Sequence, residues 1–213
     1  MRLSSYSFCS LAVLVGVLAI PTRADARPRR YYRYEEHERP RAPDHQGLLL
    51  RAAVGAGGLT ADDDLNDVAL SGAVGAFSLD VGGSLTPDLA LHGRLAFNSM
   101  FEPTISSSGE ELSELDDTSL TFTLLGLGLT YYLPSNLYLT GVVGLSRASF
   151  QYYGEEYDAL NGVGFMGDIG YEWLIGGDWG LGLAGRLELH TVSGDGERLN
   201  AAGLGVVLSA TYF

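Results

Sequence analysis

Apolar and polar residues alternate one by one from Gly47 to Phe213, in segments of roughly ten residues. The clearest segment spans residues 89–99, whose apolar face holds Leu89, Leu91, Leu95 and Phe97 and whose other face holds Ala90, His92, Arg94, Ala96 and Asn98. Successive side chains of a strand point to opposite sides, so the pattern predicts strands with one apolar and one polar face. No window offers the ~20 apolar residues of a membrane helix.

The alternation recurs in segments that predict eight strands: residues 48–57, 68–84, 89–99, 120–133, 137–147, 163–173, 179–190 and 199–213. Three connections between them are short and carry turn residues, at 86–88, 134–136 and 176–178. The other four are longer and acidic, at 58–67, 100–117, 149–159 and 192–197. Short and long connections alternate without exception, as they must when one barrel rim carries periplasmic turns and the other carries extracellular loops. The sequence therefore predicts an all-β fold, an eight-stranded antiparallel transmembrane up-and-down β-barrel, over residues 47–213.

Aromatic residues gather near the predicted short turns and the C-terminus, where a girdle at the membrane interface is expected. They are Tyr131, Tyr132, Tyr138, Tyr171, Trp173, Trp179, Tyr212 and Phe213. Their clustering supports the membrane placement of the predicted barrel.

Residues 1–26 have the pattern of a signal peptide for export through the Sec pathway. Arg2 gives the positive start, residues 11–20 form an unbroken apolar run, and Ala24 and Ala26 give the small-x-small pattern before cleavage. The single cysteine, Cys9, is removed with this segment, so no disulfide is expected. Residues 27–46, rich in Arg, Pro and Tyr, predict a flexible periplasmic segment. An alternative is that its arginines and tyrosines contact anionic lipid or cell-wall material.

Nine charged or titratable residues take the polar parity of the predicted strands. They are Arg51, Asp80, His92, Arg94, Asp168, Glu172, Arg186, Glu188 and His190. One Arg facing the middle of a bilayer would cost about 2 to 4 kcal/mol, so these side chains are expected to face the lumen. The interior of a barrel of about eight strands is only wide enough for side chains to fill it. A paired ion network that closes the lumen is therefore predicted, and a gated pore or proton path is the alternative.

The architecture resembles the small outer-membrane barrels of the OmpA/OmpX type, the outer membrane protein β-barrel domain family. The resemblance covers the signal peptide and residues 47–213, and Phe213 resembles the terminal aromatic residue that such barrels present to the barrel-assembly machinery. This sequence departs from the family in that Leu204, Val206, Leu208 and Tyr212 lie on the parity opposite to Phe213. The resemblance implies a monomer in the cell outer membrane, in contact with outer-membrane lipid and lipopolysaccharide. No cell-wall-binding domain is expected beyond the barrel.

The predicted role is structural or interactive, such as membrane integrity or adhesion, and no catalysis or cofactor is expected. A resemblance to lipid A deacylase barrels would require a closely spaced His-x-Ser pair on the lipid side. In this sequence His190 and Ser193 are three residues apart, and His190 takes the inward parity. No metal site is expected, because neither acidic cluster, at Asp62, Asp63, Asp64 and Asp67 or at Glu110, Glu111, Glu114, Asp116 and Asp117, has the spacing of a specific calcium loop.

The formal net charge of −13 argues against nucleic acid as a partner. Three alternatives to the structural role stay open from the sequence. They are a narrow channel, a lipid-modifying outer-membrane enzyme and a soluble lipocalin-like barrel that binds a ligand.

Overall fold

The computed structural model describes residues 47–63, 68–107, 110–114, 118–152, 155–156, 159–175, 178–194 and 197–213. The predicted signal peptide and the predicted N-terminal segment, residues 1–26 and 27–46, lie outside this part. Within it, no helix is both long and apolar enough to cross a membrane.

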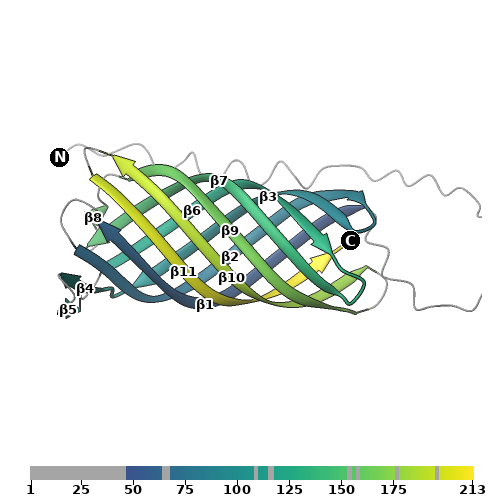
Figure 1. Cartoon of the computed structure of the whole chain (residues 1–213), viewed down its shortest axis with the longest axis horizontal. Coiled ribbons are helices and arrows are strands. Elements are labelled where there is room, and N and C mark those ends of the chain that lie inside the picture. Colours follow the sequence, from purple (N-terminus) through teal and green to yellow (C-terminus); the bar gives the residue numbers. More distant parts are fainter. Residues whose placement is uncertain are drawn as a thin grey trace, which may run out of the picture. The chain divides into compact units, whose positions relative to one another are not determined.

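Eight long strands form the wall of a barrel and run obliquely to its long axis (Figure 1). They are β1 (Leu48–Asp63), β2 (Val68–Thr86), β3 (Leu89–Phe101), β6 (Thr118–Tyr132), β7 (Leu137–Tyr152), β9 (Leu160–Leu174), β10 (Trp179–Gly194) and β11 (Glu197–Tyr212). Every long strand pairs antiparallel with its neighbours along the chain. Three short strands branch from the wall: β4 (Thr104–Ser107), β5 (Glu110–Glu114) and β8 (Glu155–Glu156).

The first and last strands close the ring. β1 pairs with β11 in an unbroken register from Leu50 opposite Tyr212 to Asp63 opposite Leu199. A closed ring leaves no long strand with an unpaired edge, and a bilayer demands this because it offers no water to an exposed backbone group.

The two faces of the wall are inverted relative to a soluble barrel. On β6, Leu125, Leu127 and Leu129 point outward and are 61%, 68% and 48% exposed, whereas inward residues such as Asp80 and Arg94 on β2 and β3 are each 1% exposed. The predicted eight-stranded antiparallel transmembrane barrel is therefore confirmed, and with it the resemblance to the small outer-membrane barrels. A lipocalin-like barrel would place its apolar side chains inside, so the burial pattern contradicts that alternative.

The predicted short turns agree with the structure where it describes them. Asn136 adopts a left-handed φ of 62°, and its N–H donates to the Leu133 carbonyl at 3.1 Å in the turn between β6 and β7. Pro87 and Asp88 alone separate β2 from β3.

The predicted long connections include residues that belong to strands in the structure. Residues 58–63 belong to β1 and pair on both sides, residues 192–194 belong to β10, and residues 104–107 and 110–114 form the hairpin of β4 and β5. Backbone hydrogen bonds continue there although the outward residues of β1, Gly58, Thr60 and Asp62, are no longer apolar side chains, because a strand that has left the hydrocarbon no longer needs an apolar outer face.

The aromatic prediction is partly wrong. Tyr131, Trp173 and Trp179 are 49%, 49% and 54% exposed on the outer face, as a girdle requires. Tyr132 and Tyr138 instead point inward, at 2% and 1% exposed. The prediction used nearness to a turn, whereas the facing of a strand residue follows its parity.

The last strand follows the parity of its leucines. Leu204, Val206 and Leu208 are 69%, 56% and 60% exposed on the outer face. Phe213 packs instead against the inner cluster that holds Tyr132, and its ring meets the Tyr132 ring edge-on at 5.8 Å between centroids. Phe213 has the inward parity of the last strand, so the departure from the family pattern comes from a last residue that faces the lumen.

Candidate functional site

The lumen collects the titratable side chains that the sequence singled out. All nine are between 1% and 5% exposed: Arg51, Asp80, His92, Arg94, Asp168, Glu172, Arg186, Glu188 and His190. They come from five different strands, β1, β2, β3, β9 and β10, so the closed ring is what brings them together.

A chain of charges crosses the middle of the lumen. The guanidinium of Arg94 donates from Nε and Nη2 to both carboxylate oxygens of Asp80, at 2.7 and 2.8 Å, and from Nη1 to Asp168 at 2.7 Å. Arg186 donates from Nε to the other oxygen of Asp168 at 2.7 Å and from Nη2 to the Ser78 hydroxyl at 3.1 Å. We call these residues the central network: Ser78, Asp80, Arg94, Asp168 and Arg186. Its carboxylates and guanidinium groups alternate, so each charge lies against one of opposite sign.

A second group of polar side chains surrounds Arg51, toward the end of the barrel that carries the short turns. Arg51 donates from Nε to the Thr211 hydroxyl at 2.9 Å and from Nη2 to the Tyr132 hydroxyl at 2.7 Å. Its Nη2 lies 3.5 Å from Glu172, and its Cζ lies 4.5 Å from the centre of the Tyr138 ring. Tyr132 and Tyr138, which face the lumen and not the membrane interface, therefore hold Arg51 inside the barrel by a hydrogen bond and a cation–π contact respectively.

His92 joins the central network to a pair of threonines. Its Nε2 lies 3.0 Å from the Thr130 hydroxyl, which lies 2.8 Å from that of Thr140, while its Nδ1 lies 4.0 Å from Asp80. This links β3, β6 and β7 through side chains as well as through the sheet.

The last polar group contains a serine that the sequence did not single out. The Ser146 hydroxyl lies 2.8 Å from His190 Nδ1, and His190 Nε2 lies 3.7 Å from Glu188, which accepts a hydrogen bond from Asn98. The order Ser–His–Glu is that of a hydrolase triad. Ser146 is 3% exposed and His190 is 2% exposed, so no substrate reaches the pair in this structure. Ser193, the serine weighed from the sequence, is exposed on the opposite face of β10.

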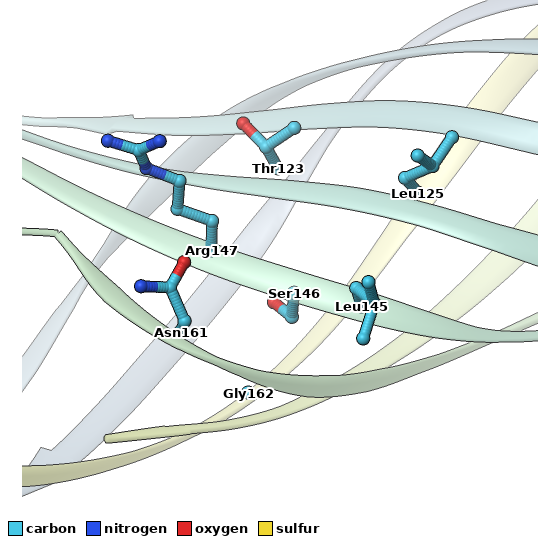
Figure 2. A pocket seen from close by; sticks show the side chains of 7 residues that line it. All are labelled: Thr123, Leu125, Leu145, Ser146, Arg147, Asn161 and Gly162. Carbon is cyan, nitrogen blue, oxygen red and sulfur yellow. The ribbon is translucent and has the colours of Figure 1, made fainter. Parts of the chain in front are cut away.

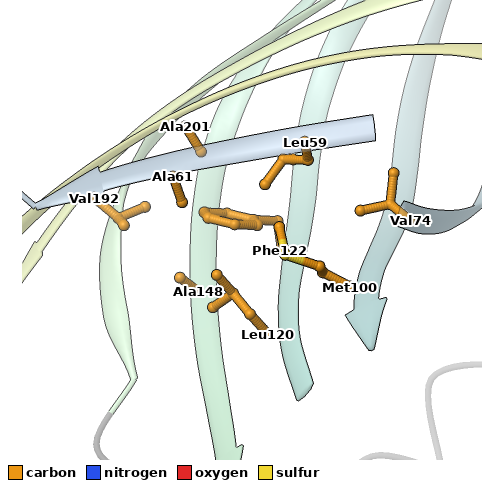
Figure 3. Close-up of a cluster of buried hydrophobic side chains, with 9 residues drawn as sticks. All are labelled: Leu59, Ala61, Val74, Met100, Leu120, Phe122, Ala148, Val192 and Ala201. Atoms are coloured by element: carbon orange, nitrogen blue, oxygen red, sulfur yellow. The ribbon is translucent and has the colours of Figure 1, made fainter. Parts of the chain in front are cut away.

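An apolar layer covers this group at the long-connection end of the lumen (Figure 3). It consists of Leu59, Ala61, Val74, Met100, Leu120, Phe122, Ala148, Val192 and Ala201. In Figure 3 the Phe122 ring lies among the other side chains, and it stacks on the His190 ring at 4.8 Å between centroids. The strand parities predict a polar lumen, and they do not reveal this apolar layer.

No group of three His, Cys, Asp or Glu side chains suited to a metal ion occurs among the described residues. Asp64 and Asp67 of the first acidic cluster and the side chains of the second cluster lie outside the described part.

No family model matches the chain, and no curated protein matches its sequence. Similar solved structures include Ail, the attachment invasion locus protein of Yersinia pestis, at 14% identity and a TM-score of 0.46, covering 76% of this chain and 97% of that one. Neisserial surface protein A is similar at 16% identity and a TM-score of 0.49, over 77% of this chain and 98% of that one. The outer membrane protein OprG from Pseudomonas aeruginosa is similar at 11% identity and a TM-score of 0.43, over 79% and 97%. The fold assignment rests on the strand register and the burial pattern.

Proposed function

We propose that this protein is a passive, monomeric outer-membrane barrel with a structural or surface-interaction role, such as membrane integrity or adhesion. The observation that carries the proposal is the inverted wall, apolar outside and charged inside. A charged lumen closed on itself needs no ligand or cofactor to be stable, because its carboxylates and guanidinium groups neutralise one another. Insertion by the barrel-assembly machinery through the C-terminal segment, after Sec export, belongs to the same proposal.

A narrow channel is the second candidate, and one observation favours it. Among the described residues, several buried polar atoms have no hydrogen-bond partner, including Arg51 Nη1, Arg186 Nη1 and Glu172 Oε1. Buried polar groups are usually satisfied, by protein or by ordered water, so these atoms favour water in the lumen. The apolar layer around Phe122 opposes conduction, because a constriction lined by apolar side chains closes a pore to ions by excluding water.

Two measurements test the proposal. Boiled and unboiled outer-membrane fractions are compared by gel migration, and a band that shifts on boiling is expected of a closed barrel. An unshifted protein in the soluble periplasm would contradict the membrane proposal. In planar bilayers the wild-type protein is expected to show no discrete conductance steps, whereas steps that change with Glu188→Gln would establish the channel instead.

A passive barrel is expected to have no catalytic activity, and the Ser146–His190–Glu188 group allows this expectation to be tested. Lipid A extracted from cells with the wild-type protein and with Ser146→Ala is expected to have the same acylation pattern. A pattern that depends on Ser146 or His190 would establish a lipid-modifying enzyme.

A further inference from the structure

A polar group interrupts the outer face of the barrel where its apolar belt ends. Thr123 on β6, Arg147 on β7 and Asn161 on β9 are direct cross-strand partners, and all three take the outward parity. On each strand, this polar residue is the next outward one beyond the last apolar outward residue toward the long connections, which is Leu125, Leu145 and Val163 respectively. Figure 2 shows the Arg147 and Asn161 side chains reaching to the same side, away from Leu125 and Leu145. The group therefore marks the edge of the belt toward the long connections.

Arg147 differs in its partners from the arginines of the lumen. Arg51, Arg94 and Arg186 each meet a carboxylate or a hydroxyl inside the barrel. Among the described residues, no carboxylate pairs with Arg147, which is exposed. Within the part of the chain that the structure describes, its guanidinium is thus a cation without an ion-pair partner at the edge of the apolar belt.

Below Arg147 the surface is hollowed. The outward residues Thr123, Leu125, Leu145, Arg147 and Asn161 line a groove of about 220 Å³. A larger groove of about 380 Å³ lies deeper, lined by Leu127 and Leu129 on β6, Gly141 and Val143 on β7, Phe165 on β9 and Leu91 on β3. The strand register places them in line, since Arg147, Leu145, Val143 and Gly141 lie opposite Thr123, Leu125, Leu127 and Leu129.

The length of this track fits one leaflet. Arg147 and Gly141 are six residues apart on β7, which is about 20 Å along a strand that rises ~3.3 Å per residue. For a strand tilted by about 40°, this corresponds to a depth of about 15 Å, half the roughly 30 Å of bilayer hydrocarbon. Arg147 thus lies at the headgroup level and Gly141 at the level where an acyl chain ends.

We propose that the outer face of β6, β7 and β9 binds one phosphate-bearing lipid of net negative charge from the outer leaflet, its phosphate paired with Arg147 and one acyl chain lying in the grooves down to Gly141. A guanidinium suits phosphate because it forms paired, charge-assisted hydrogen bonds. The inference rests on the proposed membrane function and names the lipid contact of that barrel.

The test uses the mature protein in bilayer nanodiscs of equal parts phosphatidylglycerol and phosphatidylcholine with identical acyl chains. Native mass spectrometry then identifies the lipid that stays bound after release. The wild-type barrel is expected to retain one phosphatidylglycerol in preference to phosphatidylcholine. Arg147→Gln is expected to lower this preference about fivefold, the factor that about 1 kcal/mol per basic residue at a membrane surface corresponds to. Arg147→Lys is expected to keep most of it.

Two glycine variants test the acyl groove. A Cβ at Gly141 meets no atom within 4 Å, so Gly141→Leu fits the fold and fills the groove. It is expected to reduce retention of both lipids. Gly185→Leu is the control, because Gly185 is exposed on β10, away from the groove, and a Cβ there meets only Ile169 Cγ2 at 4.0 Å. A shift on boiling must be kept by every variant, and a wild-type protein that fails to insert would overturn the proposed function itself.

Three results would overturn the lipid site while leaving the barrel intact. If Arg147→Gln keeps the preference for phosphatidylglycerol, the phosphate contact is ruled out. If Gly141→Leu and Gly185→Leu lower lipid retention equally, the acyl groove is ruled out. If native mass spectrometry instead detects a dimer that Gly141→Leu disrupts, this face binds a second copy of the chain. Soluble glycerol phosphate is expected not to displace the bound lipid, and displacement would leave only an anion site without an acyl contact.

Discussion

The inner and outer faces of the barrel wall use the same residue type for opposite purposes. Arg94 is 1% exposed and held by two carboxylates, whereas Arg147 is exposed and meets no carboxylate among the described residues. Inside, a charge is tolerated because oppositely charged groups replace its water. Outside, it is tolerated because it stands at the edge of the belt, where the headgroups begin. Parity therefore decides which environment a charge faces, and on the outer face its position along the strand decides whether it is tolerated.

The largest expected effect separates these two arginines. Arg94→Met leaves Asp80 and Asp168 buried with one cation fewer, which should lower the free energy of unfolding by about 3 to 5 kcal/mol. Arg147→Met should change it by no more than about 0.5 kcal/mol. Urea unfolding from phospholipid vesicles measures both, and equal losses would show that the two faces do not differ in this way.

A new arginine on the outer face should cost according to its depth. Val143 is 65% exposed in the apolar belt, and Val143→Arg is expected to lower the free energy of unfolding by about 2 to 4 kcal/mol. Ser193 is exposed near the long-connection rim, so Ser193→Arg should cost about 0 to 1 kcal/mol. The same unfolding measurement in vesicles decides. A cost at Val143 no larger than at Ser193 would place the bilayer elsewhere on the barrel.

The smallest effect compares two glycines three residues apart on β7. A Cβ at Gly144 would collide with the backbone of Leu125 and Gly126, so Gly144→Ala is expected to destabilise the barrel by about 1 to 3 kcal/mol. A Cβ at Gly141 meets open space. Gly141→Ala should therefore be neutral or stabilise by up to about 1 kcal/mol, because it restricts the unfolded chain. Losses of equal size would mean that both faces are close-packed.

The sequence predicts the two faces well because parity is a local property. His92 and Arg94 share an inward face by spacing alone, and the structure buries both. Parity would also have placed Tyr132 and Tyr138 correctly, had it been preferred to their nearness to a turn. The strand ends were harder, since the apolar residues among 58–63, Leu59 and Ala61, lie on the inward face, and this end of β1 is fixed by hydrogen bonds to β2 and β11.

Contacts between distant strands lie beyond this kind of prediction. Ser146 meets His190 across 44 residues because both of their strands pair with β9, where Gly162 lies opposite Ser146 and Gly164 lies opposite His190. The apolar layer around Phe122 was missed for a related reason. Its nine members come from seven strands, each contributing one or two apolar residues to a polar face, which no single segment shows.

Closure of the ring by β1 and β11 has a consequence for how the chain folds. Leu50 pairs with Tyr212, so the ring cannot close before almost the whole barrel sequence is present. Bringing ends so distant together costs the most chain entropy of any pairing in the wall, whereas neighbouring strands pair across short turns. High contact order of this kind slows folding. The hairpins are therefore expected to form early, and the seam between the first and last strands should be the last step and the slowest.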